Sequence, residues 1–343
     1  MIVLLIALVL VALGFFFKLP GRIVLGLLLI LWAATVLVHA VLPANHALAR
    51  ALGGNLRIWA FLGVAAAAIL AYRALLRMAR ARAAAVAPPP APGVFSAAEL
   101  DRYARHIVLH EIGGMGQRKL KEAKVMVVGA GGLGSPALLY LAAAGVGTIG
   151  VIDDDTVSNS NLQRQVIHTD ARIGMPKVFS AEAAIKALNP YVEVRPYHRR
   201  LTGAEAETLF AEYDLILDGS DNFDTRYLVN AAAVAARKPL ISAAISQWEG
   251  QIGLYDPARD APCYACVFPE RPAAGLAPSC AEAGVMGALP GVIGAMMAVE
   301  AIKAITGAGE VLRGRLMIHD ALYGETRCIA VRRDPACRVC GGH

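Results

Sequence analysis

Long apolar runs fill the first quarter of the chain and then stop. Residues 1–17, 23–42 and 58–76 are almost entirely apolar. A helix that spans a bilayer needs about 20 such residues, within a range of roughly 17–25. The second and third runs meet that length, and the first lies at its lower limit. We predict three transmembrane helices within residues 1–82. The alternatives are two spans, with residues 1–17 as a cleaved signal peptide, or a buried helical domain.

After residue 95 the apolar residues fall into short runs separated by polar turns. Strands are predicted at residues 125–128, 148–152, 192–196, 215–218 and 240–243. Helical patterns lie between them, at 136–144 and 178–188. This alternation is typical of a doubly wound, mainly parallel α/β sheet. Residues 83–94 are rich in proline and alanine, which predicts a linker between the membrane region and a domain at 95–343.

Charge is distributed very unevenly along the chain. The first 98 residues hold eight of the 33 basic residues and none of the 27 acidic ones, so the remainder has 25 basic against 27 acidic residues. The net charge of +6 therefore comes from the N-terminal part. Because the rest has no basic stripe interleaved with aromatic residues, nucleic-acid binding is not expected.

Four arginines cluster at the end of the third apolar run: Arg73 lies near its end, and Arg77, Arg80 and Arg82 follow it. Basic residues collect on the cytoplasmic side of membrane helices. We therefore expect a multi-pass protein of the inner membrane whose domain at 95–343 lies in the cytoplasm.

A glycine turn with the pattern G-x-G-x-x-G separates the first predicted strand from the first helix of the domain. Its glycines are Gly129, Gly131 and Gly134, and Asp153 follows 19 residues later at the end of the second strand. Such a turn lets backbone N–H groups approach a phosphate at a helix N-terminus, and the acid can bind a ribose. The pattern predicts a Rossmann-like nucleotide site without choosing between NAD, FAD and ATP. A glycine turn that serves only tight packing is the alternative.

Three charged residues in polar loops favour ATP over a dinucleotide. Arg164, Lys177 and Asp221 all fall near the predicted carboxyl edge of the sheet. Cations can offset charge on a reacting triphosphate, and a carboxylate can hold magnesium. A dehydrogenase needs no such group beyond its glycine turn.

Several short motifs of the domain form a recognisable set. They are residues 102–106, 129–134, 153–157, 160–165, 174–177, 218–222, 249–251 and 300–303. With them, residues 96–343 resemble the MoeB/ThiF/HesA family, the bacterial relatives of ubiquitin-activating enzymes. The resemblance implies ATP-dependent adenylation of the C-terminal glycine of a small ubiquitin-like sulfur carrier ending in Gly-Gly, with release of pyrophosphate. A MoaD-like carrier of molybdopterin synthesis is favoured, and a ThiS-type carrier of thiamin synthesis is the alternative.

The resemblance also implies roles for single residues. Arg164 contacts phosphates, Lys177 stabilises charge during attack on the α-phosphate, and Asp221 binds Mg²⁺. Arg105 matches an arginine that reaches ATP across a dimer interface, which implies a homodimer. The nucleotide-binding residues implied are Gly129, Gly131, Gly132, Gly134, Asp153, Ser160, Asn161, Leu162, Gln163, Arg164, Lys177, Asp221 and Asn222.

The six cysteines divide into a metal-binding pattern and two single residues. Two C-x-x-C pairs, Cys263/Cys266 and Cys337/Cys340, predict a closed zinc site, with disulfides as the alternative. We expect this site to tie the end of the chain to its middle, far from the chemistry. Family members often carry a cysteine at the position of Cys280, which in some forms a covalent link with the carrier or its sulfur. Cys328, in an alternating apolar run, is expected in the core.

Two other function classes remain at this point. A membrane-anchored NAD-binding oxidoreductase or sensor would use the glycine turn and Asp153, but it would give no role to Lys177 or the cysteine pairs. A non-catalytic membrane scaffold with an inherited fold is the other possibility. No rhodanese-like pattern follows Cys340, so we expect a sulfur donor in trans.

Overall fold

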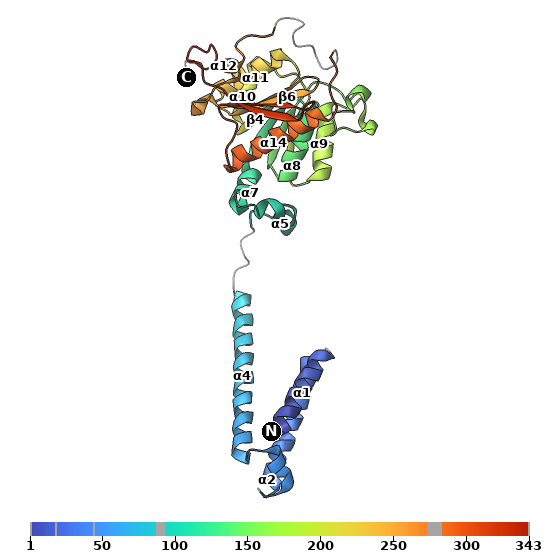
Figure 1. The fold of residues 1–343 in the computed structure, drawn as a ribbon, viewed down its shortest axis with the longest axis vertical. Coiled ribbons are helices and arrows are strands. Elements are labelled where there is room, and N and C mark those ends of the chain that lie inside the picture. The colour runs from blue at the N-terminus through green and yellow to red at the C-terminus, as the bar shows by residue number, and fades with distance from the viewer. Residues whose placement is uncertain (1, 18, 44, 87–92, 273–282, 342–343) are drawn as a thin grey trace. The chain divides into compact units, whose positions relative to one another are not determined.

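The computed structural model describes residues 2–17, 19–43, 45–86, 93–272 and 283–341, and Cys280 therefore lies outside the described residues. The chain divides into two compact units, Met1–Ala91 and Pro92–His343. The first unit is helical in its described part, whereas the second is a mixed α/β domain (Figure 1).

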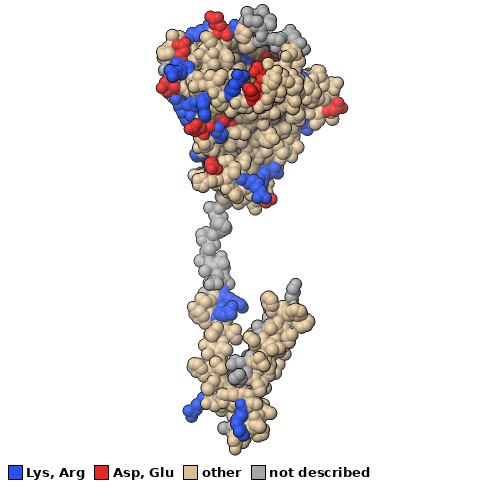
Figure 2. Space-filling view, viewed as in Figure 1, with Lys and Arg blue, Asp and Glu red and all other residues tan. Residues whose placement is uncertain are grey.

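The N-terminal unit contains the helices α1 (Ile2–Phe16), α2 (Gly21–Val41), α3 (Ala47–Leu52) and α4 (Leu56–Val86). Helices α2 and α4 pack closely around Trp32, whose indole N–H donates to the Trp59 carbonyl at 2.9 Å. A Cβ at Gly63 would lie only 2.1 Å from the Trp32 ring, so glycine is what allows the two helices to approach. Most large apolar side chains of these helices face outward, and the face in Figure 2 carries few charged atoms.

By length and composition, segments Ile23–Val41 and Leu56–Met78 could each cross a membrane. Helix α1 has 15 residues, which is about 22 Å at 1.5 Å per residue and shorter than a hydrocarbon core of about 30 Å. Helix α4 continues to Val86, so the first residues of the predicted linker are helical. Three of these four residues, Ala83 to Ala85, are alanine, the strongest helix former.

Within the described part of the second unit, eight strands form one sheet in the order β3-β2-β1-β4-β5-β6-β7-β8. Five are parallel, as the alternating pattern predicts, and β6 to β8 extend the sheet in antiparallel fashion. The strands are β1 (Lys124–Val128), β2 (Thr148–Ile152), β3 (Glu193–Tyr197), β4 (Leu215–Asp218), β5 (Leu240–Ile245), β6 (Glu249–Tyr255), β7 (Arg315–Asp320) and β8 (Glu325–Ala330).

Helices cover both faces of this sheet (Figure 1). Alternate residues of β1 separate the two cores: Val125 and Val127 pack toward one face, and Met126 and Val128 toward the other. The first face is covered by α8 (Gly134–Ala144), α9 (Lys177–Leu188) and α14 (Leu289–Thr306). The second face is covered by α10 (Gly203–Ala211), α11 (Phe223–Ala235) and α12 (Tyr264–Val267).

Helix α14 is also apolar and long enough to span a membrane, but half of it is buried inside the domain. It packs against α8 and the sheet, so its apolar composition reflects core packing. The shorter helices α5 (Ala97–Arg102), α6 (Ala104–Ile107) and α7 (Gly113–Glu122) precede β1. A capping box between Ser96 and Glu99 starts α5, as its sequence predicts.

Candidate nucleotide site and cysteine cluster

A cavity of about 900 Å³ opens at the carboxyl ends of β1, β2 and β4. This is the edge at which parallel α/β sheets bind ligands. Many of the residues that the sequence predicts for the nucleotide line this one cavity: Gly129, Gly131, Gly132, Asp153, Arg164, Lys177, Asp221 and Asn222.

Glycine at two positions of the turn is required by local geometry. Gly129 has φ +92°, in the left-handed region that favours glycine. A Cβ at Gly134 would lie 1.9 Å from the Gly129 carbonyl oxygen, so no other residue fits where α8 begins. Gly131 is less constrained, because the nearest atom to its Cβ would be Gln165 Nε2 at 3.7 Å. Gly131 itself lines the cavity.

Asp153 is held by the turn that it faces. Its Oδ2 accepts the Ala130 N–H at 2.7 Å and its Oδ1 accepts the Asp155 N–H at 2.8 Å. Burial raises the pKa of this carboxyl, although the Lys177 charge and the two N–H groups act in the opposite direction. The carboxyl group is thus fixed in orientation beside the glycine turn.

Lys177 begins α9, and its side chain is only 6% exposed. Its Nζ lies 2.6 Å from Oδ2 of Asp155, and its backbone N–H donates to the Asp155 carbonyl at 2.9 Å. An antiparallel bridge between Thr156 and Pro176 joins the same two segments. Sequence reasoning missed Asp155, although it belongs to the run of three acids that contains Asp153.

His168 connects the glycine turn to α9 by two hydrogen bonds of its imidazole ring. Its Nε2–H donates to the Ala130 carbonyl at 2.9 Å, and its Nδ1 accepts the Ser180 hydroxyl of α9 at 2.9 Å. Burial lowers the pKa of this imidazole, and the nearby Lys177 and Arg172 charges lower it further, against the Ala130 contact, which raises it. A neutral imidazole therefore links the glycine turn to α9.

The loop after β4 carries Asp221, which is exposed, and Asn222, which caps α11 by accepting the Thr225 N–H at 2.9 Å. Beneath it, the buried Arg226 donates to the carbonyls of Ser220 and Ala243. These contacts shape the loop that presents Asp221. Sequence reasoning missed Arg226, because a single arginine in a helix carries no distinctive pattern.

Some predicted site residues lie outside the cavity lining in the described residues. Ser160 and Asn161 belong to the short helix η1 (Asn159–Asn161), and the Ser160 carbonyl accepts from Arg164 Nη1 at 3.1 Å. Arg105 is exposed on α6. The residues concerned are Arg105, Gly134, Ser160, Asn161, Leu162 and Gln163.

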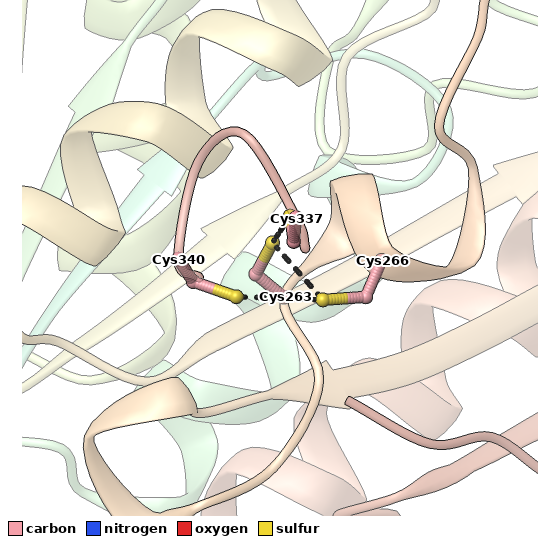
Figure 3. Close-up of side chains that lie close together, drawn as sticks. All are labelled: Cys263, Cys266, Cys337 and Cys340. Carbon is pink, nitrogen blue, oxygen red and sulfur yellow. Dashed lines mark hydrogen bonds between the residues drawn. The ribbon is translucent and has the colours of Figure 1, made fainter. Parts of the chain in front are cut away.

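The two C-x-x-C pairs come together although more than 70 residues separate them (Figure 3). Their sulfur atoms lie 3.8 Å apart for Cys263–Cys266, 3.7 Å for Cys263–Cys337 and 3.4 Å for Cys266–Cys340. A tetrahedral Zn²⁺ with Zn–S bonds near 2.3 Å would hold its sulfurs about 3.8 Å apart. All four cysteines are free thiols, so the group could hold a metal ion.

The surroundings of the four thiols differ. Burial raises the pKa of Cys263, whereas at Cys337 burial is outweighed by N–H groups of Cys340 and Val339 and by neighbouring thiols, which bring the pKa to about 7. The cluster is also closer to the nucleotide cavity than the sequence suggests, since Tyr264, next to Cys263, lines that cavity. The expectation for Cys328 is wrong: it is exposed on β8, the strand at the edge of the sheet, whose residues are all exposed.

Comparison with known proteins agrees with this geometry. The family model described as the ThiF family matches residues 103–339. The sulfur carrier protein adenylyltransferase of Thermus thermophilus is 51% identical over 247 residues, covering 71% of this chain and 91% of that protein. The SAMP-activating enzyme E1 of Haloferax volcanii is 47% identical over 245 residues, covering 71% of this chain and 90% of its own length.

A third relative is longer than the matching region. The probable adenylyltransferase/sulfurtransferase MoeZ of Mycobacterium tuberculosis is 51% identical over 243 residues, and the match spans 62% of its length. Among solved structures, Escherichia coli MccB in a crystal with ATP has a TM-score of 0.61 and 25% identity, covering 70% of this chain and 74% of that one.

Proposed function

Because this chain belongs to the ThiF family, we propose that it is an ATP-dependent adenylyltransferase that activates the C-terminal carboxylate of a ubiquitin-like sulfur carrier. The observation that carries the proposal is the single cavity shared by Gly131, Asp153 and Lys177. Two relatives whose length is covered almost completely support this substrate class. They are named as a sulfur carrier protein adenylyltransferase and a SAMP-activating enzyme E1.

In this reaction a carboxylate oxygen of the carrier attacks the α-phosphorus of ATP. The new O–P bond forms as the bond to the β-phosphate breaks, and pyrophosphate leaves with that electron pair. A C-terminal carboxylate is already ionised at neutral pH, so no general base is needed. Catalysis then consists of positioning and charge stabilisation. Lys177 and Arg164 supply positive charge in the cavity, and Asp153 binds the ribose.

Two metal ions belong to the proposal. Mg²⁺ bound to ATP would be held by Asp221, whose carboxylate is exposed at the cavity. Zn²⁺ would be held by the four cysteines, a donor set typical of structural zinc. When bound, zinc would cross-link the segments of Cys263 and Cys337 and supply no catalytic chemistry.

The finer assignments rest on resemblance. A MoaD-like carrier is favoured, with a ThiS-type carrier as the alternative. A homodimer is proposed in which the exposed Arg105 of one copy serves the nucleotide of the other. Cys280, outside the described residues, is a candidate for a covalent link to the carrier. The nucleotide site is also proposed to include Ser160, Asn161, Leu162 and Gln163.

The N-terminal unit is proposed to anchor the enzyme in the inner membrane as a multi-pass segment. Its outward apolar side chains and the spans 23–41 and 56–78 support this. Arg73 and Arg77, exposed at the end of the last span, favour a cytoplasmic position for the domain that follows.

Carrier-dependent exchange of labelled pyrophosphate into ATP tests the function. We expect the full chain in detergent to catalyse exchange only when a carrier ending in Gly-Gly is present, and Lys177→Ala to abolish it. Absence of exchange with every such carrier, or full exchange in Lys177→Ala, would contradict the proposal. Titration with ATP and with NAD separates it from an oxidoreductase, because only ATP should bind.

A further inference from the structure

Asn230 is buried on α11, and the two ends of its amide contact two consecutive residues, Cys263 and Tyr264. Its Nδ2 donates to the Cys263 sulfur at 3.8 Å, and its Oδ1 accepts the Tyr264 N–H at 2.8 Å. N–H donors of this kind, outside the ligand set, orient thiolate ligands and tune metal affinity.

The same helix forms part of the nucleotide cavity. Phe223, Thr225, Arg226 and Tyr227, in the first turns of α11, all line it. Asn230 follows Arg226 by four residues and Tyr227 by three, so it lies on the same side of the helix one turn later. One rigid element thus contacts the cavity at its start and the cysteine cluster at Asn230.

The second connection is an aromatic wall. Tyr264, which follows Cys263, packs against Tyr227 with ring centroids 5.5 Å apart and against Phe268 at 4.8 Å. The Tyr227 hydroxyl donates to the Phe268 carbonyl at 2.9 Å. These three aromatic residues all line the nucleotide cavity. The residue that follows Cys263 in the chain is therefore itself part of the cavity wall.

From these contacts we infer that Asn230 is a positioning residue that couples metal binding at the four cysteines to nucleotide binding in the cavity. The inference rests on the proposed function, because it takes zinc and ATP as the two ligands. With metal bound, Cys263 is fixed, Asn230 holds Tyr264 in place, and the wall is set for the nucleotide. Coupling of binding free energies is reciprocal, so ATP must in turn tighten metal binding.

The test measures zinc affinity of the full chain in detergent by competition with a chromophoric chelator, with and without saturating Mg-ATP. In the wild type we expect ATP to tighten zinc binding by about fivefold or more. Asn230→Asp keeps the acceptor for Tyr264 but loses the donor to sulfur. We expect it to weaken zinc binding by about 10-fold or more and to lose the ATP effect.

Asn189→Asp is the matched control, since Asn189 is also a buried asparagine, donating to Tyr103 Oη and the Ala142 carbonyl away from the cysteines. It should keep both the zinc affinity and the ATP effect. The inference is overturned if ATP leaves wild-type zinc affinity unchanged, if Asn230→Asp behaves as the wild type, or if Asn189→Asp loses the ATP effect equally. A wild type that binds ATP but no zinc would instead overturn the proposed zinc site itself.

Discussion

Asp155 and Lys177 are joined twice, by an ion pair of 2.6 Å between Oδ2 and Nζ and by a backbone hydrogen bond of 2.9 Å. The lysine side chain is 6% exposed and the aspartate side chain 67% exposed. The buried partner is thus the one proposed to act on the phosphates, and the exposed partner fixes its position. Asp155 is therefore expected to matter for the rate more than for nucleotide affinity.

Asp155→Asn tests this division of roles. The amide oxygen can still accept from the ammonium, but without a negative charge it holds Lys177 less firmly. We expect kcat for pyrophosphate exchange to fall about 10-fold while KM for ATP changes by less than about threefold. Asp154→Asn is the control, because Asp154 is an exposed neighbour in the same cavity wall. Equal effects of the two variants would show that the ion pair has no particular role.

The two glycines of the turn should respond differently to alanine. At Gly134 a methyl group would lie 1.9 Å from the Gly129 oxygen, and Gly134→Ala should destabilise the domain by about 3 kcal/mol or more. At Gly131 the methyl group meets only Gln165 at 3.7 Å, so stability should change by less than about 1 kcal/mol. Since this methyl group enters the cavity, Gly131→Ala should weaken ATP binding. Denaturant unfolding and ATP titration of both variants separate the effects, and a Gly134→Ala variant as stable as the wild type would contradict the packing argument.

The burial of His168 predicts that the folded domain loses stability in mild acid. Its pKa is lowered in the folded protein, mainly by burial, whereas in the unfolded chain it is near the ordinary value of about 6.5. Below that pH the unfolded chain binds more protons, so the free energy of unfolding falls by up to about 1.4 kcal/mol per pH unit until the folded pKa is reached.

Unfolding of residues 92–343 between pH 7.5 and 5.5 measures this slope. His168→Gln keeps a donor for Ala130 and an acceptor for Ser180 and should flatten the slope. His110→Gln, at a side chain that is 98% exposed, should leave it unchanged. A slope that survives in His168→Gln would assign the acid sensitivity to another group.

Features of the fold and the site could be predicted where their signal lies within a short stretch of the sequence. The glycine turn, Asp153 and Lys177 lie within motifs whose spacing dictates a strand, a turn and a helix, and the structure brings them to one cavity. The antiparallel strands β6 to β8 were not anticipated in full, because their pairing depends on contacts across the sheet. Cys328 was misjudged for the same reason: its alternating pattern marks a strand, but only the edge position of β8 leaves that strand exposed.

The contacts of Asp155, Arg226 and Asn230 were beyond prediction for a different reason. Each side chain acts through a partner that the fold supplies, namely Lys177 for the first, backbone carbonyls for the second and Cys263 for the third. Residue type alone does not reveal such partners. The motifs that line the cavity could therefore be found in the sequence, whereas the residues that hold them in place required the structure.

Membrane anchoring predicts how the chain behaves on extraction. Alkaline carbonate releases peripheral proteins, because charge repulsion at high pH breaks their attachment to the membrane surface. It does not extract helices embedded in hydrocarbon, because extraction would expose their apolar side chains to water. We expect the full chain to stay in the membrane pellet. Residues 92–343, which form a compact unit with their own core, should be soluble without detergent. Release of the full chain by carbonate would instead mean that residues 1–86 pack as a water-soluble helical domain.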